Sequence, residues 1–280
     1  MTTQALSPSN RLFSFAYVSQ DAFKQLASRA EQEDWSIRTY ETDTHVTPLL
    51  KNYLTQVYGR AEDTGCITYN SDRTRCAFNT GLFDRETGED IIAFFRPNNR
   101  AAADQQWLLE KFCALSDVDL QQLLQQPPVV TFYTKPSDIY FDPTREIRCG
   151  IAHIADDRRE RLPTDWQSLG DSEIVNRIQD SLSVARRRAL RDYKVAVPTY
   201  YPETQSINWL LPAYNQREST ASASLLVTQD REDADAYAAV TVLTVQMAYS
   251  NARLLTRPGA EWLLTAVGAT CDARDALPSI

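Results

Sequence analysis

The sequence predicts an α+β protein in which mixed, largely antiparallel sheets pack with several helices as one compact unit. Three observations favour this class. Segments with strand character occur in clusters with helical segments between them, without the regular alternation that marks a doubly wound sheet. Only 8 of the 280 residues are glycine, which disfavours a glycine-rich all-β architecture. The apolar fraction of 43% and the charged fraction of 24% are those of an ordinary folded domain.

The first half of the chain is expected to begin with helices and to continue with β structure. Asp21 can cap a first helix, and Thr47–Pro48 can begin a second one, because proline suits the first helical position. Residues 65–95 contain short runs of strand character separated by polar turns. Two helices and one strand are then predicted, over residues 102–112, 117–125 and 129–133.

The second half is expected to contain more strands and two long helices. Apolar residues that recur every three or four positions predict a helix over residues 171–193. A last helix is predicted over 233–255, ended by Arg257-Pro258-Gly259. The strands are predicted at 138–142, 147–154, 195–197, 206–211 and 224–228.

No change of composition divides the chain. We therefore expect a flexible N-terminus over residues 1–11, a single domain over 12–265 and a C-terminal tail over 266–280. The N-terminus has no apolar leader, and the most apolar stretch, residues 236–249, is too short to span a bilayer. The sequence thus predicts a cytoplasmic protein that does not engage a membrane.

Charge, cysteine usage and missing motifs exclude several classes of function. The net charge of −8 disfavours broad binding of duplex DNA, although residues 144–200 carry a net charge of +2, which suits a confined anionic ligand. The five cysteines are scattered and the two histidines are too few for a multi-histidine site, so we expect no metal site. Glycine-rich phosphate loops, dinucleotide fingerprints and nucleophile elbows are also absent, and the sequence names no cofactor.

Several polar residues lie where predicted strands or helices end. His153 is a candidate general acid or base, since imidazole titrates near neutrality; the alternative is a core histidine. Lys194 adjoins an apolar strand, where an ammonium group needs an anionic or carbonyl partner or must reach solvent. These two are the candidate catalytic residues. The candidate ligand-binding residues, for which turns, salt bridges and surface positions are the alternatives, are Asn79, Thr80, Arg96, Arg161, Gln205, Asn251 and Arg253.

A series of short motifs resembles one uncharacterised domain family of bacteria and fungi over about residues 12–264. The motifs are Phe15-Ala-Tyr17, Phe78-Asn-Thr-Gly-Leu82, Asp138-Ile-Tyr-Phe-Asp142, His153-Ile154, Tyr193-Lys194, Val197-Pro198, Tyr200-Tyr201, Met247-Ala-Tyr-Ser-Asn-Ala-Arg253 and Arg257-Pro258. Larger members are fused to RNA-binding modules, including LOTUS-type winged helices and cold-shock-type barrels. The resemblance implies a link to RNA metabolism or nucleotide chemistry and brings no established reaction.

These observations leave three hypotheses open. The first is a protein that binds a nucleotide or an RNA end, with hydrolase or transferase activity on a phosphoester, as in a phosphodiesterase. The second is a non-catalytic interaction or oligomerisation module, in which Arg186–Arg188 and the acidic remainder form complementary surfaces of a homo-oligomer. The third is a defence or toxin effector that acts on nucleotides.

Overall fold

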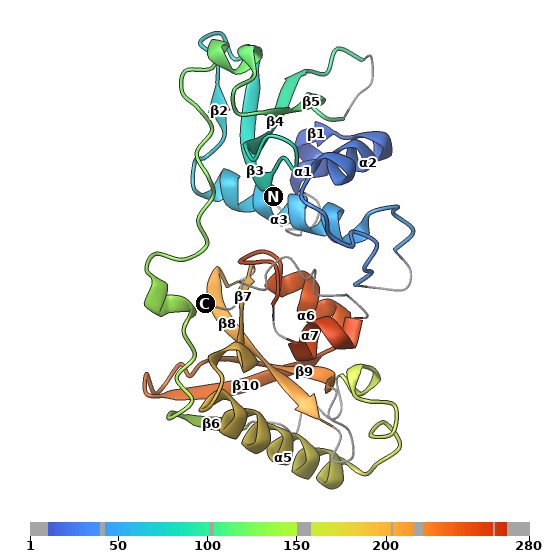
Figure 1. Cartoon of the computed structure of the whole chain (residues 1–280), viewed down its shortest axis with the longest axis vertical. Coiled ribbons are helices and arrows are strands. Elements are labelled where there is room, and N and C mark those ends of the chain that lie inside the picture. Colours follow the sequence, from blue (N-terminus) through green and yellow to red (C-terminus); the bar gives the residue numbers. More distant parts are fainter. Residues whose placement is uncertain are drawn as a thin grey trace, which may run out of the picture. The chain divides into compact units, whose positions relative to one another are not determined.

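The computed structural model describes residues 11–39, 43–100, 104–149, 158–202, 204–214, 221–259 and 261–267. The sequence analysis expected a single domain over 12–265; by its internal contacts the chain groups into two compact units, Met1–Phe132 and Tyr133–Ile280. Each unit contains its own five-stranded sheet, its own helices and its own buried core (Figure 1). The α+β class with mixed, largely antiparallel sheets is confirmed.

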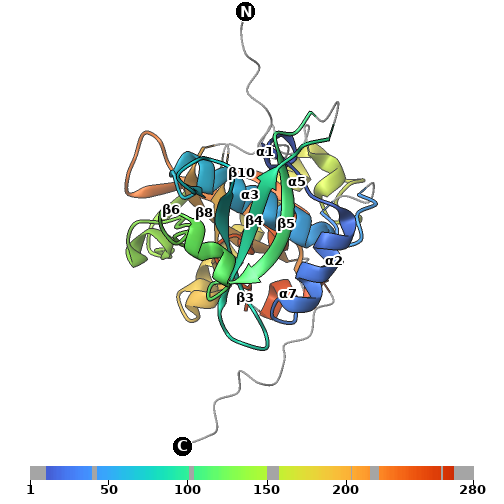
Figure 2. The same cartoon turned by 90° about the horizontal axis from the view of Figure 1, so that it is seen from above.

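The first unit is a sheet with helices that precede its four-stranded meander. Its elements are α1 (Arg11–Phe15), β1 (Ala16–Tyr17), α2 (Gln20–Arg29), α3 (Pro48–Asp63), β2 (Thr68–Tyr69), β3 (Cys76–Phe83), β4 (Asp90–Pro97) and β5 (Trp107–Ala114). The strand order is β1-β5-β4-β3-β2, with β1 parallel to β5 and the other pairs antiparallel. Figure 2 shows β3, β4 and β5 side by side along the same sheet.

The second unit repeats this plan with a single long helix. Its elements are β6 (Glu146–Cys149), α5 (Asp171–Ala189), β7 (Val197–Tyr201), β8 (Ser206–Tyr214), β9 (Ala221–Gln229), β10 (Ala236–Leu243), α6 (Val245–Ala252) and α7 (Glu261–Val267). The predicted apolar stripe of α5, which includes Ile174, Ile178 and Leu182, packs into a core with Trp209 and Leu211 of β8. The opposite side of the sheet is contacted by α6 at β7 and β9.

The two sheets have the same strand order. The second sheet runs β6-β10-β9-β8-β7, and β6 is parallel to β10 while the other pairs are antiparallel. In each unit the first strand therefore pairs with the last one, and a helical connection leads to the second strand. The sequence showed no internal repeat, so this correspondence is visible only in the topology.

Two predicted helices are strands. The predicted helix 102–112 overlaps β5, and the predicted helix 233–255 is β10 followed by the short helix α6. Leu, Glu, Lys and Ala in these segments favour a helix locally, but each segment pairs with a neighbour on both sides, which overrides that preference. Thr244 then begins α6, because its hydroxyl accepts a hydrogen bond from the backbone N–H of Met247 at 3.3 Å.

Smaller corrections concern caps and short segments. The N-cap of α2 is Ser19 rather than Asp21, and its hydroxyl accepts from the N–H of Ala22 at 3.2 Å. Residues 118–122 form a 3₁₀ turn in place of the predicted helix 117–125. The predicted strands 129–133 and 138–142 are not strands, since these residues have no partner strand and include a 3₁₀ turn at 136–139. Of the predicted strand 147–154, β6 covers the start, and the rest lies outside the described residues.

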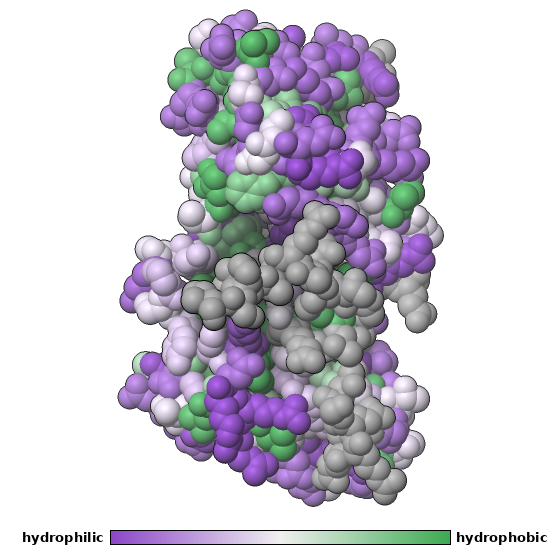
Figure 3. Space-filling model, viewed as in Figure 1, coloured by the Kyte–Doolittle hydropathy of each residue, from purple (hydrophilic) through white to green (hydrophobic). Residues whose placement is uncertain are grey.

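On the face drawn in Figure 3, hydrophilic side chains predominate among the described residues, and apolar side chains lie between them. Among the helices that the structure describes, none combines the length and apolar character that a membrane span requires.

Candidate functional site

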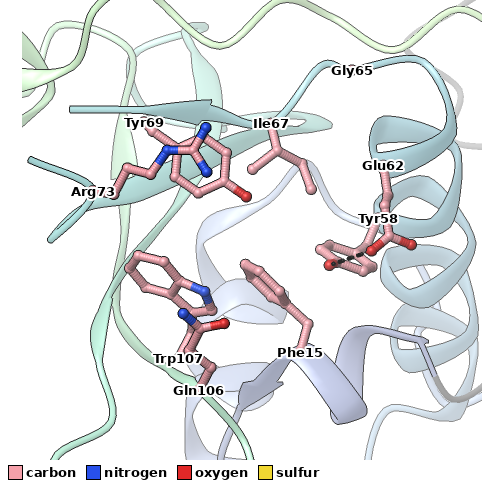
Figure 4. A pocket seen from close by; sticks show the side chains of 9 residues that line it. All are labelled: Phe15, Tyr58, Glu62, Gly65, Ile67, Tyr69, Arg73, Gln106 and Trp107. Carbon is pink, nitrogen blue, oxygen red and sulfur yellow. Dashed lines mark hydrogen bonds between the residues drawn. The ribbon is translucent and has the colours of Figure 1, made fainter. Parts of the chain in front are cut away.

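An aromatic cavity lies in the first unit, next to the parallel pair β1–β5. Its volume is about 430 Å³. The side chains around it come from α1, α3, β2, β5 and the turns beside them (Figure 4). The described residues that line it are Phe15, Tyr58, Glu62, Gly65, Ile67, Tyr69, Arg73, Gln106 and Trp107.

Aromatic rings form the walls of the cavity. Phe15, at the end of α1, lies 5.0 Å from Tyr58 and 5.8 Å from Trp107 between ring centroids, and it stacks on the indole. Tyr69, at the end of β2, lies 6.1 Å from Trp107. Trp107 is the first residue of β5 and is 4% exposed, so its neighbours in the sheet hold its ring in place. Offset aromatic packing of this kind holds rings rigidly at little cost in entropy.

One side of the cavity carries a carboxylate held by two donors. The Nε of Arg11 donates to Oε2 of Glu62 at 2.7 Å. The hydroxyl of Tyr58 donates to Oε1 at 3.3 Å, as the dashed line in Figure 4 shows. Burial, followed by the negative charge of Glu62, raises the pKa of Tyr58, and burial also raises the pKa of Tyr69. Both phenols are therefore protonated at neutral pH and can donate hydrogen bonds.

The other side of the cavity carries a guanidinium group. Arg73 lies in the β2–β3 turn with a φ of 56°, and its backbone N–H donates to the carbonyl of Asn70 at 3.2 Å. Its guanidinium carbon lies 5.2 Å from the centroid of the Tyr69 ring, a cation–π distance (Figure 4). The cavity thus combines stacking surfaces, hydrogen-bond donors, a carboxylate and a cation within one unit.

The predicted residues of the first unit do not line this cavity. Asn79 and Thr80 are buried in a β-bulge, where the register of β3 against β4 shifts. The Nδ2 of Asn79 donates to Asp90 at 2.8 Å, and the hydroxyl of Thr80 donates to the carbonyl of Ile91 at 2.7 Å. These contacts account for both side chains as parts of the bulge. Arg96 is half-buried near the end of β4, opposite Leu108 of β5.

The other predicted residues belong to the second unit. Lys194 is exposed and lines a groove of about 480 Å³, whereas His153 lies outside the described residues. Asn251 and Arg253 lie at the end of α6, which packs against the strand that precedes Gln205. The Nε of Arg161 lies 3.6 Å from a carboxylate oxygen of Glu160. The predicted residues that the structure describes are therefore divided between the two units.

The arginine run expected to serve oligomerisation is partly used inside the second unit. Arg186 donates to the carbonyls of Pro143 and Thr144, each at 2.7 Å. The guanidinium carbon of Arg188 lies 4.0 Å from the centroid of the Tyr214 ring. Arg187 is exposed. The run as a whole is thus not a free basic surface.

The sequence analysis missed the aromatic cavity because its walls come from five separate segments. One signal was available: Tyr58 and Glu62 are four residues apart, directly beyond the helix predicted from Pro48 to Val57, and in α3 they place an aromatic ring and a carboxylate on one face. Trp107 was hidden in a segment predicted as a helix. In the part of the chain that the structure describes, no three His, Cys, Asp or Glu side chains gather as metal ligands would.

The profile of the family described as Domain of unknown function (DUF3825) matches residues 26–262. The chain belongs to this family. The DUF3825 match covers all the lining residues of the aromatic cavity except Phe15, and it extends across both units. Searches of curated proteins and of solved structures gave no match.

Proposed function

We propose that this DUF3825 chain binds a nucleotide or an RNA end, with the base in the aromatic cavity of the first unit. The observation that carries the proposal is the joint presence of four aromatic rings, the carboxylate of Glu62 and the guanidinium of Arg73 around one cavity. A volume of about 430 Å³ is in the range of small-molecule sites, which is roughly 300–1,000 Å³.

Each component has a role that a nucleotide can use. Phe15 and Tyr69 are half-buried, so their rings give the cavity accessible aromatic surface, and stacking of a base on an aromatic ring contributes about 1–3 kcal/mol. Glu62 can accept from amino or imino groups of a base through Oε1, which has a second lone pair beyond the one that Tyr58 engages. Arg73 can contact a phosphate at the mouth of the cavity.

A quaternary ammonium ligand is the other occupant that an aromatic cage with a carboxylate suggests. Arg73 argues against it, since its charge lies over Tyr69 in the same lining and would repel a cation. The volume also exceeds what a single ammonium head group needs. The mixed charge of the lining fits a base that is joined to a phosphate.

The link to RNA metabolism and the proposed phosphoester chemistry rest on the sequence alone. Fusion to RNA-binding modules in larger relatives, as the resemblance implies, agrees with a nucleotide ligand. Hydrolase or transferase chemistry on a phosphoester rests on His153 and Lys194 and stays a prediction. Release of product from a short RNA, compared between the original protein and a Lys194→Ala variant, tests it; equal rates in both would contradict the assignment of Lys194.

The binding proposal is tested by titrating the protein with adenosine, guanosine, cytidine and uridine 5′-monophosphates in calorimetry. Tyr69→Leu keeps apolar volume but removes a stacking face, and Arg73→Gln removes the cation. We expect each substitution to weaken binding about tenfold, which corresponds to about 1.4 kcal/mol.

Arg85→Gln is the matched control, because Arg85 is an exposed arginine of the same unit and lies in the β3–β4 turn outside the lining. It should bind as the original protein does. Ribose 5-phosphate, which lacks a base, should bind much more weakly than the nucleotides. Affinities that are the same in Tyr69→Leu, Arg73→Gln and Arg85→Gln would overturn the proposal.

A further inference from the structure

The second unit contains a groove of about 480 Å³, separate from the cavity in which the proposed function places the base. Three segments line it: residues 136–141 before β6, residues 193–198 from the α5–β7 connection into the start of β7, and residues 256–259 after α6. Its polar lining side chains include Tyr140, Tyr193, Lys194 and Arg257.

Two lining segments of the groove hold topological positions that also line the aromatic cavity, whereas residues 256–259 of the groove and Gln106 and Trp107 of the cavity have no such counterpart. In the first unit, Phe15 precedes the first strand of the sheet, and Gly65 and Ile67 belong to the connection from α3 into β2. The groove is lined by the same two parts of its own unit, the segment before β6 and the connection from α5 into β7. Because the sheets share one strand order, these are equivalent positions of one topology.

The walls of the groove are anchored to the core of the second unit. Phe141 stacks on Tyr237 at 4.8 Å between centroids, and the indole N–H of Trp209 donates to the carbonyl of Ile139 at 3.1 Å. The indole N–H of Trp262 donates to the carbonyl of Val195 at 3.0 Å. Tyr140 and Tyr193, which adjoin these anchored residues, are therefore held by a fixed backbone.

The exposed side chains of the groove combine rings with cations. Tyr140 is 58% exposed and Tyr193 is 69% exposed, although both are large aromatic residues. Lys194 and Arg257 form no ion pair with a carboxylate among the described residues. Two carboxylates lie close by in sequence, but each accepts backbone N–H groups: Asp192 from Lys194 at 2.9 Å, and Asp138 from Thr134 and Lys135.

We infer that this groove is a second nucleotide site, in which an unpaired base stacks on Tyr140 or Tyr193 and its phosphate contacts Lys194 or Arg257. The inference rests on the proposed function for its class of ligand, and it adds that each chain takes two nucleotides. A proline-rich peptide fits less well, because its backbone brings no anionic group for Lys194 or Arg257.

The test is a site-resolved titration of the whole chain, in which amide chemical shifts are followed by NMR as uridine or adenosine 5′-monophosphate is added. Two separate groups of residues should shift, one around Tyr69 and one around Tyr193. The double variant Tyr193→Ala/Lys194→Gln alters exposed side chains only and should weaken the second response at least tenfold. It should leave the first response within twofold, and Arg73→Gln should give the reverse pattern.

Arg187→Gln is the control, since it removes an exposed cation of the second unit outside the groove. Shifts confined to the residues around Tyr69 would overturn the second site and leave the proposed function standing. Shifts at neither site would overturn both. A response of the groove to a proline-rich peptide, with none to either nucleotide, would also overturn the inference.

Discussion

Gly81 is a residue at which both the backbone and a neighbouring side chain require the absence of a Cβ. Its φ is +71°, and a Cβ at this position would lie 2.7 Å from the hydroxyl oxygen of Tyr53. Gly88 has nearly the same φ, +70°, but nothing lies within 4 Å of its Cβ position. Replacing Gly88 therefore measures the cost of a Cβ at a positive φ alone, whereas replacing Gly81 adds the cost of a close contact.

We expect Gly88→Ala to destabilise the protein by about 1–2 kcal/mol, the cost of a left-handed conformation with a Cβ. Gly81→Ala should cost a further 1–3 kcal/mol, roughly, because the alanine overpacks against Tyr53. Urea unfolding of the two variants measures the difference. Equal losses of stability would show that Tyr53 moves away freely.

Asp84 links the β3–β4 turn to α2 and makes the stability of the first unit depend on pH. A hydrogen bond from the backbone N–H of Glu86 at 2.9 Å, aided by Arg29 Nε at 2.5 Å and opposed by burial, holds its pKa below the usual range. A lowered pKa in the folded state means that the carboxylate stabilises the fold above its unfolded pKa. That contribution is lost as the pH falls through the folded pKa.

Asp84→Asn should therefore lower the free energy of unfolding at pH 7 by roughly 1–3 kcal/mol, since it leaves Arg29 with the carbonyl of Phe112 but without its carboxylate partner. The gap between variant and original protein should narrow below about pH 4. Denaturant unfolding at a series of pH values measures it. Asp21→Asn is the control: it alters an exposed carboxylate and should change stability by less than about 1 kcal/mol. A difference in stability between Asp84→Asn and the original protein that stays constant with pH would contradict the role of Asp84.

At the scale of elements, α5 is joined to the segment before β6 by one arginine. Arg186 donates two hydrogen bonds to the carbonyls of Pro143 and Thr144, while the next residue, Arg187, is exposed. Arg186→Gln should cost roughly 1–3 kcal/mol of stability, and Arg187→Gln should stay within about 0.5 kcal/mol. Thermal unfolding compares them. If both variants unfold alike, the helix does not depend on this link.

Elements with a strong local signal could be predicted from the sequence. The proline at the start of α3 predicted where that helix begins, and the apolar stripe of α5 predicted that helix. Short runs of strand character bounded by polar turns predicted β3, β4, β8 and β9. The two elements mistaken for helices, β5 and β10, are the last strands of their sheets. Each lies between the strand that precedes it and the first strand of its sheet, which is distant in sequence, so its conformation is decided by pairing that local propensity does not reveal.

The candidate site was less predictable than the fold for a related reason. Lys194 was found because a charged residue next to an apolar strand is conspicuous, and it lines the groove of the second unit. Tyr58, Tyr69 and Trp107 look like ordinary core aromatics one at a time, and their common cavity depends on how α3, β2 and β5 meet. Only the tertiary arrangement distinguishes a binding wall from a core contact.

At the scale of the whole chain, the division into two units predicts where a protease cuts first. Residues 131–137 run without strand pairing around the boundary at Phe132 and Tyr133, and Tyr133 is 41% exposed. Brief digestion with chymotrypsin should cut after Phe132 or Tyr133 and leave two resistant fragments, because cleavage favours exposed, unpaired segments. Mass spectrometry identifies the sites; early cuts inside β3, β4, β8 or β9 would contradict the division.

The pairing of the first strand with the last has a consequence for how the chain is made. Ala16 of β1 pairs with Trp107 of β5, and Glu146 of β6 pairs with Ala236 of β10. Neither sheet can be completed on the ribosome until nearly all of its own unit has emerged. Pairing between strands so distant in sequence slows folding. Until the last strand has been synthesised, the first strand has no partner and its backbone edge is exposed. We therefore expect a chaperone to be most useful during synthesis of each unit, when it can cover the unpaired first strand.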